Sequence, residues 1–232
     1  MSQNQTQLSK DDIQRLLARL DEDLWEHNQE AIIYVVGGAN IALAIDMGRT
    51  TTDIGFAAKS GLDAVSAAAK RIAESEPGLR LESDWINSAF TNYGQGGMTW
   101  SWFDNKDNDT PATILDGYAL KVELASPEML LALKTLVDRP RDIDDAHKLM
   151  RLTGICTPLG IGRNLARFTG RRVFDEQGAP YMYLHIDPTF PHIFDNLPAD
   201  LCRMRDAQSA SERAADRAAR KTARNRSSPT VM

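Results

Sequence analysis

The hydrophobic pattern predicts that the chain begins with an amphipathic helix that leads into a buried strand. Apolar residues recur at helical spacing in segment 8–29, and Ser9 followed by Asp12 is typical of a helix N-terminus. Residues 31–36, "AIIYVV", are wholly apolar and rich in β-branched side chains, which is typical of a buried strand. Gly37 and Gly38 end this run, and the pattern after them predicts a helix entered directly from the glycines.

Alternating strand and helix patterns follow. Residues 51–58, "TTDIGFAA", predict a second strand, and the Ala-rich segment 61–75 predicts a helix that stops near Gly78. Residues 83–90, "SDWINSAF", predict another helix capped by the serine at its start. Residues 118–125, "YALKVELA", alternate apolar and charged side chains and predict a half-buried third strand.

The second half of the chain reads as mostly helical. Segment 126–137 opens with a capping serine followed by proline at the first helical position. Segment 141–154 predicts one more helix, which ends near Gly154. Residues 171–186 indicate, more weakly, a hairpin around Gln177 and Gly178.

The order of these elements predicts an α/β fold, with a small mixed sheet, flanking helices and a mostly helical C-terminal part. We divide the chain into an N-terminal helix that packs on the core (1–30), a central domain (31–158), a C-terminal extension with the hairpin (159–200) and a basic Ala/Arg-rich tail (201–232).

Composition narrows the class of protein. Hydrophobic residues make up 42% of the chain, enough for a packed core, and the longest apolar runs are too short to span a membrane. The polar N-terminus lacks the apolar segment of a secretory signal, and the two cysteines, Cys156 and Cys202, form no CxxC metal motif. We therefore expect a cytoplasmic protein.

The net charge of −5 is unevenly distributed along the chain. Residues 201–232 carry eight basic and three acidic side chains, so this tail has a charge of +5 and the rest of the chain −10. A basic tail on an acidic body is suited to RNA or DNA phosphates. The alternative interpretation, which the sequence favours, is a solvated helix without a specific partner.

The glycines after the first strand are the first candidate for chemistry. A helix that begins at glycines leaves backbone N–H groups free to bind phosphate. Asp53 lies fifteen residues after Gly38 on the next predicted strand, where its carboxylate is suited to an Mg²⁺ ion that bridges to a triphosphate. The alternative interpretation is a tight strand-to-helix turn and an ordinary aspartate at the end of a strand.

A wider pattern favours the first interpretation. The segment "VVGGANIALAIDMGRTTTDIGF" resembles the first motif of the minimal nucleotidyltransferases of the DNA polymerase β-like superfamily, a GG or GS turn, a helix and then R-x-T-x-D-I-D. The segments "AAAKRIAESEPGLRLESDWINSAF" and "LKVELASPEMLLALKTLVDRPRDIDDAHKLM" resemble a bacterial group of that superfamily. The last segment is also similar to the Lys and RD-x-x-D motifs of AbiEii-type abortive-infection toxins. The resemblance covers about residues 31–155.

The resemblance implies roles for individual residues. It places Gly37 and Gly38 at the nucleoside triphosphate and Asp53 at the first metal ligand. Arg49 matches the basic residue of the motif, and Lys134 matches the family lysine, a phosphate or substrate contact.

The same resemblance concerns a second group of charged residues. Asp142 and Asp145 match RD-x-x-D, with Asp142 favoured to face the site, and Arg139 and Arg141 match nucleic acid or triphosphate contacts. Glu123, on the polar face of the third strand, matches the third carboxylate of the superfamily. The alternative for Lys134 and the two aspartates is that they are ordinary charges on solvated helices.

Gly55 departs from the motif, because the superfamily has its second carboxylate there. Two carboxylates hold two metal ions about 3.5–4 Å apart in such sites. Three accounts stay open. Asp53 and Glu123 suffice with one metal, or the chain is an inactive relative that still binds nucleotide or RNA, or the glycine makes a toxin harmless.

We therefore expect NTP-dependent nucleotidyl transfer to an RNA, such as tRNA, or to a protein acceptor, with Mg²⁺ or Mn²⁺ as cofactor. The resemblance implies a toxin–antitoxin or phage-defence system, with a cognate antitoxin as a further partner. The alternative is a catalytically inactive nucleotidyltransferase-like module that binds a nucleotide, RNA or protein.

Overall fold

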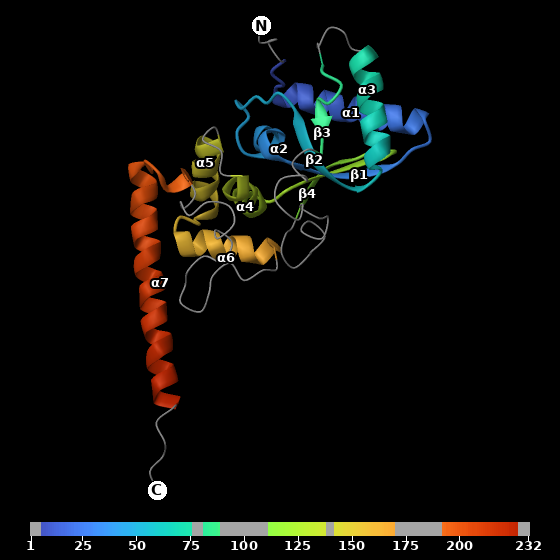
Figure 1. Cartoon of the computed structure of the whole chain (residues 1–232). Coiled ribbons are helices and arrows are strands. Elements are labelled where there is room, and N and C mark those ends of the chain that lie inside the picture. The colour runs from blue at the N-terminus through green and yellow to red at the C-terminus, as the bar shows by residue number, and fades with distance from the viewer. Residues whose placement is uncertain (1–5, 76–80, 89–110, 138–141, 170–191, 227–232) are drawn as a thin grey trace. The chain divides into compact units, whose positions relative to one another are not determined.

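The computed structural model describes residues 6–75, 81–88, 111–137, 142–169 and 192–226 (Figure 1). They form two compact units, Met1–Val137 and Asp138–Met232, which are described separately. The predicted stop at Gly78 and the predicted hairpin at 171–186 lie outside the described residues.

The first unit is an α/β structure built on a mixed five-stranded sheet. The strand order is β3-β2-β1-β5-β4, with β1 antiparallel to β2 and parallel to β5. Strand β3 is parallel to β2, and β4 is antiparallel to β5. The small mixed sheet with flanking helices, as predicted, is confirmed. The elements of this unit are α1 (Lys10–Glu26), β1 (Ala31–Val36), α2 (Gly37–Ala44), β2 (Ile54–Ser60), α3 (Leu62–Ser75), β3 (Ile86–Asn87), β4 (Ala112–Asp116), β5 (Leu120–Leu124) and α4 (Pro127–Val137).

Helix α1 begins where the sequence predicts. The backbone N–H of Asp12 donates to Ser9 Oγ over 3.3 Å, and the backbone N–H of Ser9 donates to Asp12 Oδ2 over 3.1 Å. These reciprocal bonds form a capping box that satisfies backbone donors of the first turn. The hydrogen bonds from Ser9 also hold the pKa of Asp12 below its ordinary value.

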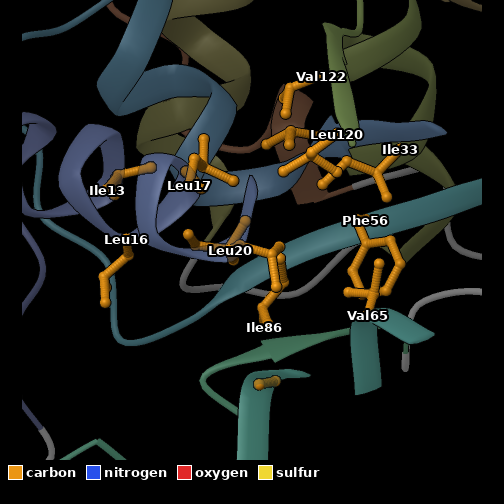
Figure 2. Close-up of a cluster of buried hydrophobic side chains, with 14 of the residues drawn as sticks. Ile13, Leu16, Leu17, Leu20, Ile33, Phe56, Val65, Ile86, Leu120 and Val122 are labelled. Atoms are coloured by element: carbon orange, nitrogen blue, oxygen red, sulfur yellow. The ribbon is translucent and has the colours of Figure 1, made fainter. Parts of the chain in front are cut away.

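The hydrophobic core lies on one face of the sheet, where side chains of α1 and α3 pack against alternate residues of the strands (Figure 2). Ile33 of β1, Phe56 of β2 and Val122 of β5 all point into this core. Because successive strand residues point to opposite faces, residues 55 and 123 lie on the other face. The packing of α1 and α3 therefore leaves the other face of the sheet to the candidate site residues.

The helix predicted for residues 83–90 is wrong, because its central part forms strand β3. The backbone N–H of Ile54 donates to the carbonyl of Trp85 over 2.8 Å, and Trp85 Nε1 donates to the carbonyl of Ala69 over 3.0 Å. Trp85 and Ile86 are both buried in the core. Packing and strand pairing with distant residues thus override the local helical pattern.

The described residues of the second unit form helices joined by short loops, with no strand among them. Helix α5 ends as predicted at Gly154, whose φ of 72° is a left-handed conformation that glycine adopts without strain. In this unit, and in the first, no described helix is both long and apolar enough to cross a membrane. The elements of the second unit are α5 (Ile143–Thr153), α6 (Pro158–Thr169), the 3₁₀ helix η6 (His192–Phe194) and α7 (Ala199–Arg226).

A buried carboxylate of α1 fixes the turn between β4 and β5. Asp21 is buried, and its carboxylate accepts backbone N–H groups from Tyr118 (3.1 Å), Ala119 (2.8 Å) and Leu120 (2.7 Å). A Cβ at Gly117 would collide with this hydrogen-bonded carboxylate, so the turn requires glycine there. Asp21 thereby ties α1 to the start of β5.

Replacing Asp21 with alanine is expected to lower the free energy of unfolding by about 2–4 kcal/mol, because backbone donors are left buried without their acceptor. Urea denaturation followed by circular dichroism measures this change. The matched control is Glu22→Ala on the exposed side of the same helix, with an expected change within about 0.5 kcal/mol. Equal losses in both variants would contradict this role for Asp21.

A bidentate ion pair joins helix α7 to helix α5. Arg151 Nε lies 2.6 Å from Asp200 Oδ2, and Arg151 Nη2 lies 3.2 Å from Asp200 Oδ1. The hydrogen bond from Arg151 is the main reason that the pKa of Asp200 falls to about 2. The ionised form of Asp200 is therefore the form that the fold favours.

The sign of this pKa shift predicts how the contact depends on pH. The contribution of Asp200 to the stability of the second unit is present above its ordinary pKa of 3.8 and is lost as pH falls through about 2. In Arg151→Gln the pKa of Asp200 is expected to rise toward 3.8, as measured by an NMR titration of the side-chain carboxyl carbon. An unchanged pKa in that variant would show that Arg151 is not the cause.

Candidate functional site

A glycine turn joins β1 to α2. Gly37 has a φ of +67°, a left-handed conformation that favours glycine, and it is the first residue of α2. Val36 occupies the N-cap position of this helix and provides no side-chain cap. As the sequence predicts, α2 begins directly at the glycines. No side chain of its N-cap residue occupies the backbone N–H groups of its first turn.

Asp53 immediately precedes β2, at the end of the strand that adjoins this turn. Val36 pairs with Gly55 in the antiparallel ladder, and Asp53 precedes Gly55 by two residues. A Cβ at Gly38 would lie only 2.8 Å from Thr51 Oγ1, and this hydroxyl donates to the carbonyl of Asp53 over 3.0 Å. The structure therefore brings Gly37, Gly38 and Asp53 together.

The carboxylate of Asp53 is exposed and held on one side only. Asn87 Nδ2 donates to Asp53 Oδ2 over 3.0 Å and to the carbonyl of Asp84 over 3.2 Å. Asp53 Oδ1 has no hydrogen-bond partner among the residues that the structure describes. Sequence reasoning missed Asn87, because the segment that contains it was interpreted as a helix instead of a strand beside β2.

Neither the backbone conformation nor the space around position 55 requires a glycine there. A Cβ there would meet Val36 Cγ2 at 3.6 Å and the carbonyl oxygen of Val36 at 3.8 Å, which are ordinary van der Waals contacts. Gly55 pairs with Asn87 of β3, the residue whose amide contacts Asp53. The position of the second carboxylate in the motif is therefore free to accept a side chain beside Asp53.

Glu123 lies away from Asp53. Tyr34 pairs with Ala57 of β2 and with Glu123 of β5, so Glu123 is level with a residue four positions along β2 from Asp53. With two strand spacings of about 4.8 Å and a rise of about 3.3 Å per residue, the two Cα atoms are roughly 16 Å apart. Glu123 Oε1 instead lies 2.7 Å from Lys121 Nζ. This separation is too large for both carboxylates to bind one ion.

Arg49 and Lys134 belong to the same unit as Asp53. Arg49 is half-buried, and its backbone N–H donates to the carbonyl of Asp46 over 2.9 Å in the loop that leads to β2. Lys134 is buried in the last turn of α4, a helix that contacts α2. The expectation that both residues contact phosphate stays a prediction.

Asp142 and Asp145 belong to the second unit. Asp142 occupies the N-cap position of α5 and Asp145 lies in its first turn, and both side chains are buried. Buried carboxylates differ from the solvated helix charges of the alternative interpretation, because burial requires compensating partners. Arg139 and Arg141 lie outside the described residues.

No cluster of three or more His, Cys, Asp or Glu side chains that is able to hold a metal ion is found within the described ranges. The carboxylate at the glycine turn is Asp53, with Asn87 as its neighbour. An Mg²⁺ ion at this position would therefore need most of its ligands from phosphate oxygens and water.

Compared with protein-family models, with curated proteins and with solved structures, the chain has no significant match. The geometry at the glycine turn is therefore the basis on which a function is proposed.

The two glycines of the site are expected to respond differently to substitution. Gly38→Ala is expected to lower the free energy of unfolding by about 1–3 kcal/mol, because the new methyl group collides with Thr51. Gly55→Ala, the matched control, is expected to change it by less than about 0.5 kcal/mol. Urea denaturation of both variants, and of Gly38→Ala combined with Thr51→Ala, measures these effects. No partial recovery in the double variant would contradict the collision with Thr51.

Proposed function

We propose that the first unit is a nucleotidyltransferase-like module that binds a nucleoside triphosphate together with Mg²⁺, and that with Gly55 it binds the nucleotide without transferring it. The observation that carries the proposal is the position of Asp53, an exposed carboxylate beside the glycine-opened N-terminus of α2. The resemblance of residues 31–155 to the nucleotidyltransferase motifs supplies the class of ligand.

The N-terminus of α2 supports phosphate binding. Backbone N–H groups of the first turn of a helix favour an anion, both as donors and through the helix dipole. Gly37 and Gly38 add no side chain that would keep phosphate oxygens away from this backbone. α4, which carries Lys134, packs against the same helix, consistent with the phosphate contact that the resemblance assigns to this lysine.

The donor set at Asp53 fits a nucleotide-bound Mg²⁺ ion, and Mn²⁺ equally. Mg²⁺ commonly takes one or two carboxylates from the protein and its other ligands from phosphates and water. Asp53 would supply the carboxylate, and the amide of Asn87 would orient it. When bound, such an ion neutralises phosphate charge and polarises a phosphoryl oxygen.

Two features support binding without transfer. A two-metal transfer site needs carboxylates that hold two ions close together, and position 55 offers none. Glu123 is paired with Lys121 and its Cα lies roughly 16 Å from that of Asp53, so it does not replace the missing group. The described part of the site thus has one carboxylate where transfer chemistry uses at least two.

Binding is tested by calorimetry with each NTP in the presence and absence of Mg²⁺. The wild type is expected to bind at least one NTP more tightly with Mg²⁺, and Asp53→Asn is expected to weaken this binding at least tenfold by removing the carboxylate ligand. Asp63→Asn is the matched control, an exposed aspartate in the first turn of α3, with an expected change below twofold. If no NTP binds to the wild type, the proposal is wrong.

Transfer is tested by incubating the same proteins with labelled NTP, Mg²⁺ and total tRNA. The wild type is expected to transfer no label to the tRNA or to protein. Gly55→Asp is expected to transfer label, and the added substitution Asp53→Asn is expected to abolish this activity. Transfer by the wild type that disappears in Asp53→Asn would show instead that the chain is an enzyme that works with one carboxylate.

A further inference from the structure

Helix α7 consists of two parts with different surroundings (Figure 1). The first part packs within the second unit, where Leu201 is fully buried and Gln208 Oε1 accepts the backbone N–H of Cys156 over 2.8 Å. Glu212 Oε1 accepts a hydrogen bond from the hydroxyl of Thr157 over 2.8 Å. The helix then continues as far as Arg226, and four of its next five side chains are exposed, those of Arg213, Ala214, Ala215 and Arg217.

The positive charge of the tail is concentrated in this second part of α7. Residues 199–212 contain two basic and three acidic side chains, whereas residues 213–226 contain six basic and one acidic. The six basic residues are Arg213, Arg217, Arg220, Lys221, Arg224 and Arg226. The first part of α7 is thus close to neutral, and residues 213–226 carry a charge of +5.

Four of these arginines follow one face of the helix. Positions 213, 217, 220 and 224 are spaced by four, three and four residues, which places them in one row along an α-helix. At a rise of 1.5 Å per residue, this row is about 16 Å long. We call these four positions the arginine row.

We propose that the arginine row binds the sugar–phosphate backbone of a nucleic acid. Guanidinium groups bind phosphate through two parallel hydrogen bonds and stay charged at any physiological pH. Double-stranded nucleic acid of the B form carries one negative charge per about 1.7 Å of its axis, so a row about 16 Å long faces several phosphates. α7 holds the row in place, because the first part of the helix contacts α5 and is hydrogen-bonded to Cys156 and Thr157, which precede α6.

The other residues of this segment argue against a membrane or a hydrophobic partner helix. Basic helices that lie on membranes pair their charges with a face of Trp, Phe or Leu side chains. In residues 213–226 the only apolar residue type is alanine. Charge, without an apolar surface, is therefore what this part of α7 offers to a partner.

This proposal is independent of the nucleotide site, because every residue in it belongs to the second unit. The test measures fluorescence anisotropy of labelled duplex DNA, duplex RNA and single-stranded RNA with the full-length protein over a range of KCl concentrations. The test variant replaces the arginine row with glutamine at all four positions. The control variant removes the same number of charges from α1 and α3 by replacing Lys10, Arg15, Arg19 and Lys70 with glutamine.

The wild type is expected to bind at least one of the three polymers, with an affinity that falls as salt rises at a slope of about −3 to −4 on a double-logarithmic plot. The test variant is expected to lose at least tenfold in affinity and most of the salt dependence, and the control less than threefold. The polymer that binds most tightly identifies a duplex or a single strand as the partner.

Other outcomes would overturn the proposal. In the first, the test variant keeps a helical circular dichroism spectrum and binds nucleic acid as tightly as the wild type or the control variant does. Another is no binding to any of the three polymers at low salt. A third is binding to phosphatidylserine vesicles that depends on the arginine row while none of the nucleic acids binds, which would make a membrane surface the partner.

Discussion

The pairing register between β1 and β2 is the constraint on which the candidate site depends. Val36 opposite Gly55 brings the end of β2 to the glycine turn, and this places Asp53 beside the N-terminus of α2. A slip of one residue would turn every side chain of β2 to the opposite face and move Phe56 out of the core. Packing of the core and position of the site carboxylate are therefore fixed by the same hydrogen-bonded ladder.

The same sheet explains why Glu123 is not near Asp53 in the described part of the candidate site. Glu123 lies on the same face of the sheet as Gly55, but its place on β5 keeps it far from the glycine turn. The parallel pairing of β5 with β1 places Glu123 level with Tyr34, in the middle of the sheet, where Lys121 neutralises it. Asn87, from the edge strand β3, is instead the polar neighbour of Asp53.

Some charged side chains hold the fold together, and others are available to a partner. Asp21 and Asp200 are each held by several hydrogen bonds, and each connects one helix to another element of its own unit. Beyond Glu212, α7 has a charge of +5 over residues 213–226, and its described arginines there, Arg213 and Arg217, are exposed. The contrast separates charges that build the fold from charges available to a partner, and the boundary falls within a single helix.

The sequence by itself determined the elements that depend on local chemistry. Ser9 with Asp12 marks the start of α1 and Gly154 the end of α5, because caps involve only neighbouring residues along the chain. The tertiary structure alone decided strand β3, which follows Trp85, because its pairing with β2 and the burial of Trp85 are made by residues distant in sequence. It also decided that Asn87 is the polar group that reaches Asp53. The distance between residues on different strands depends on the pairing register, which the alternation of apolar and polar residues along one strand does not specify.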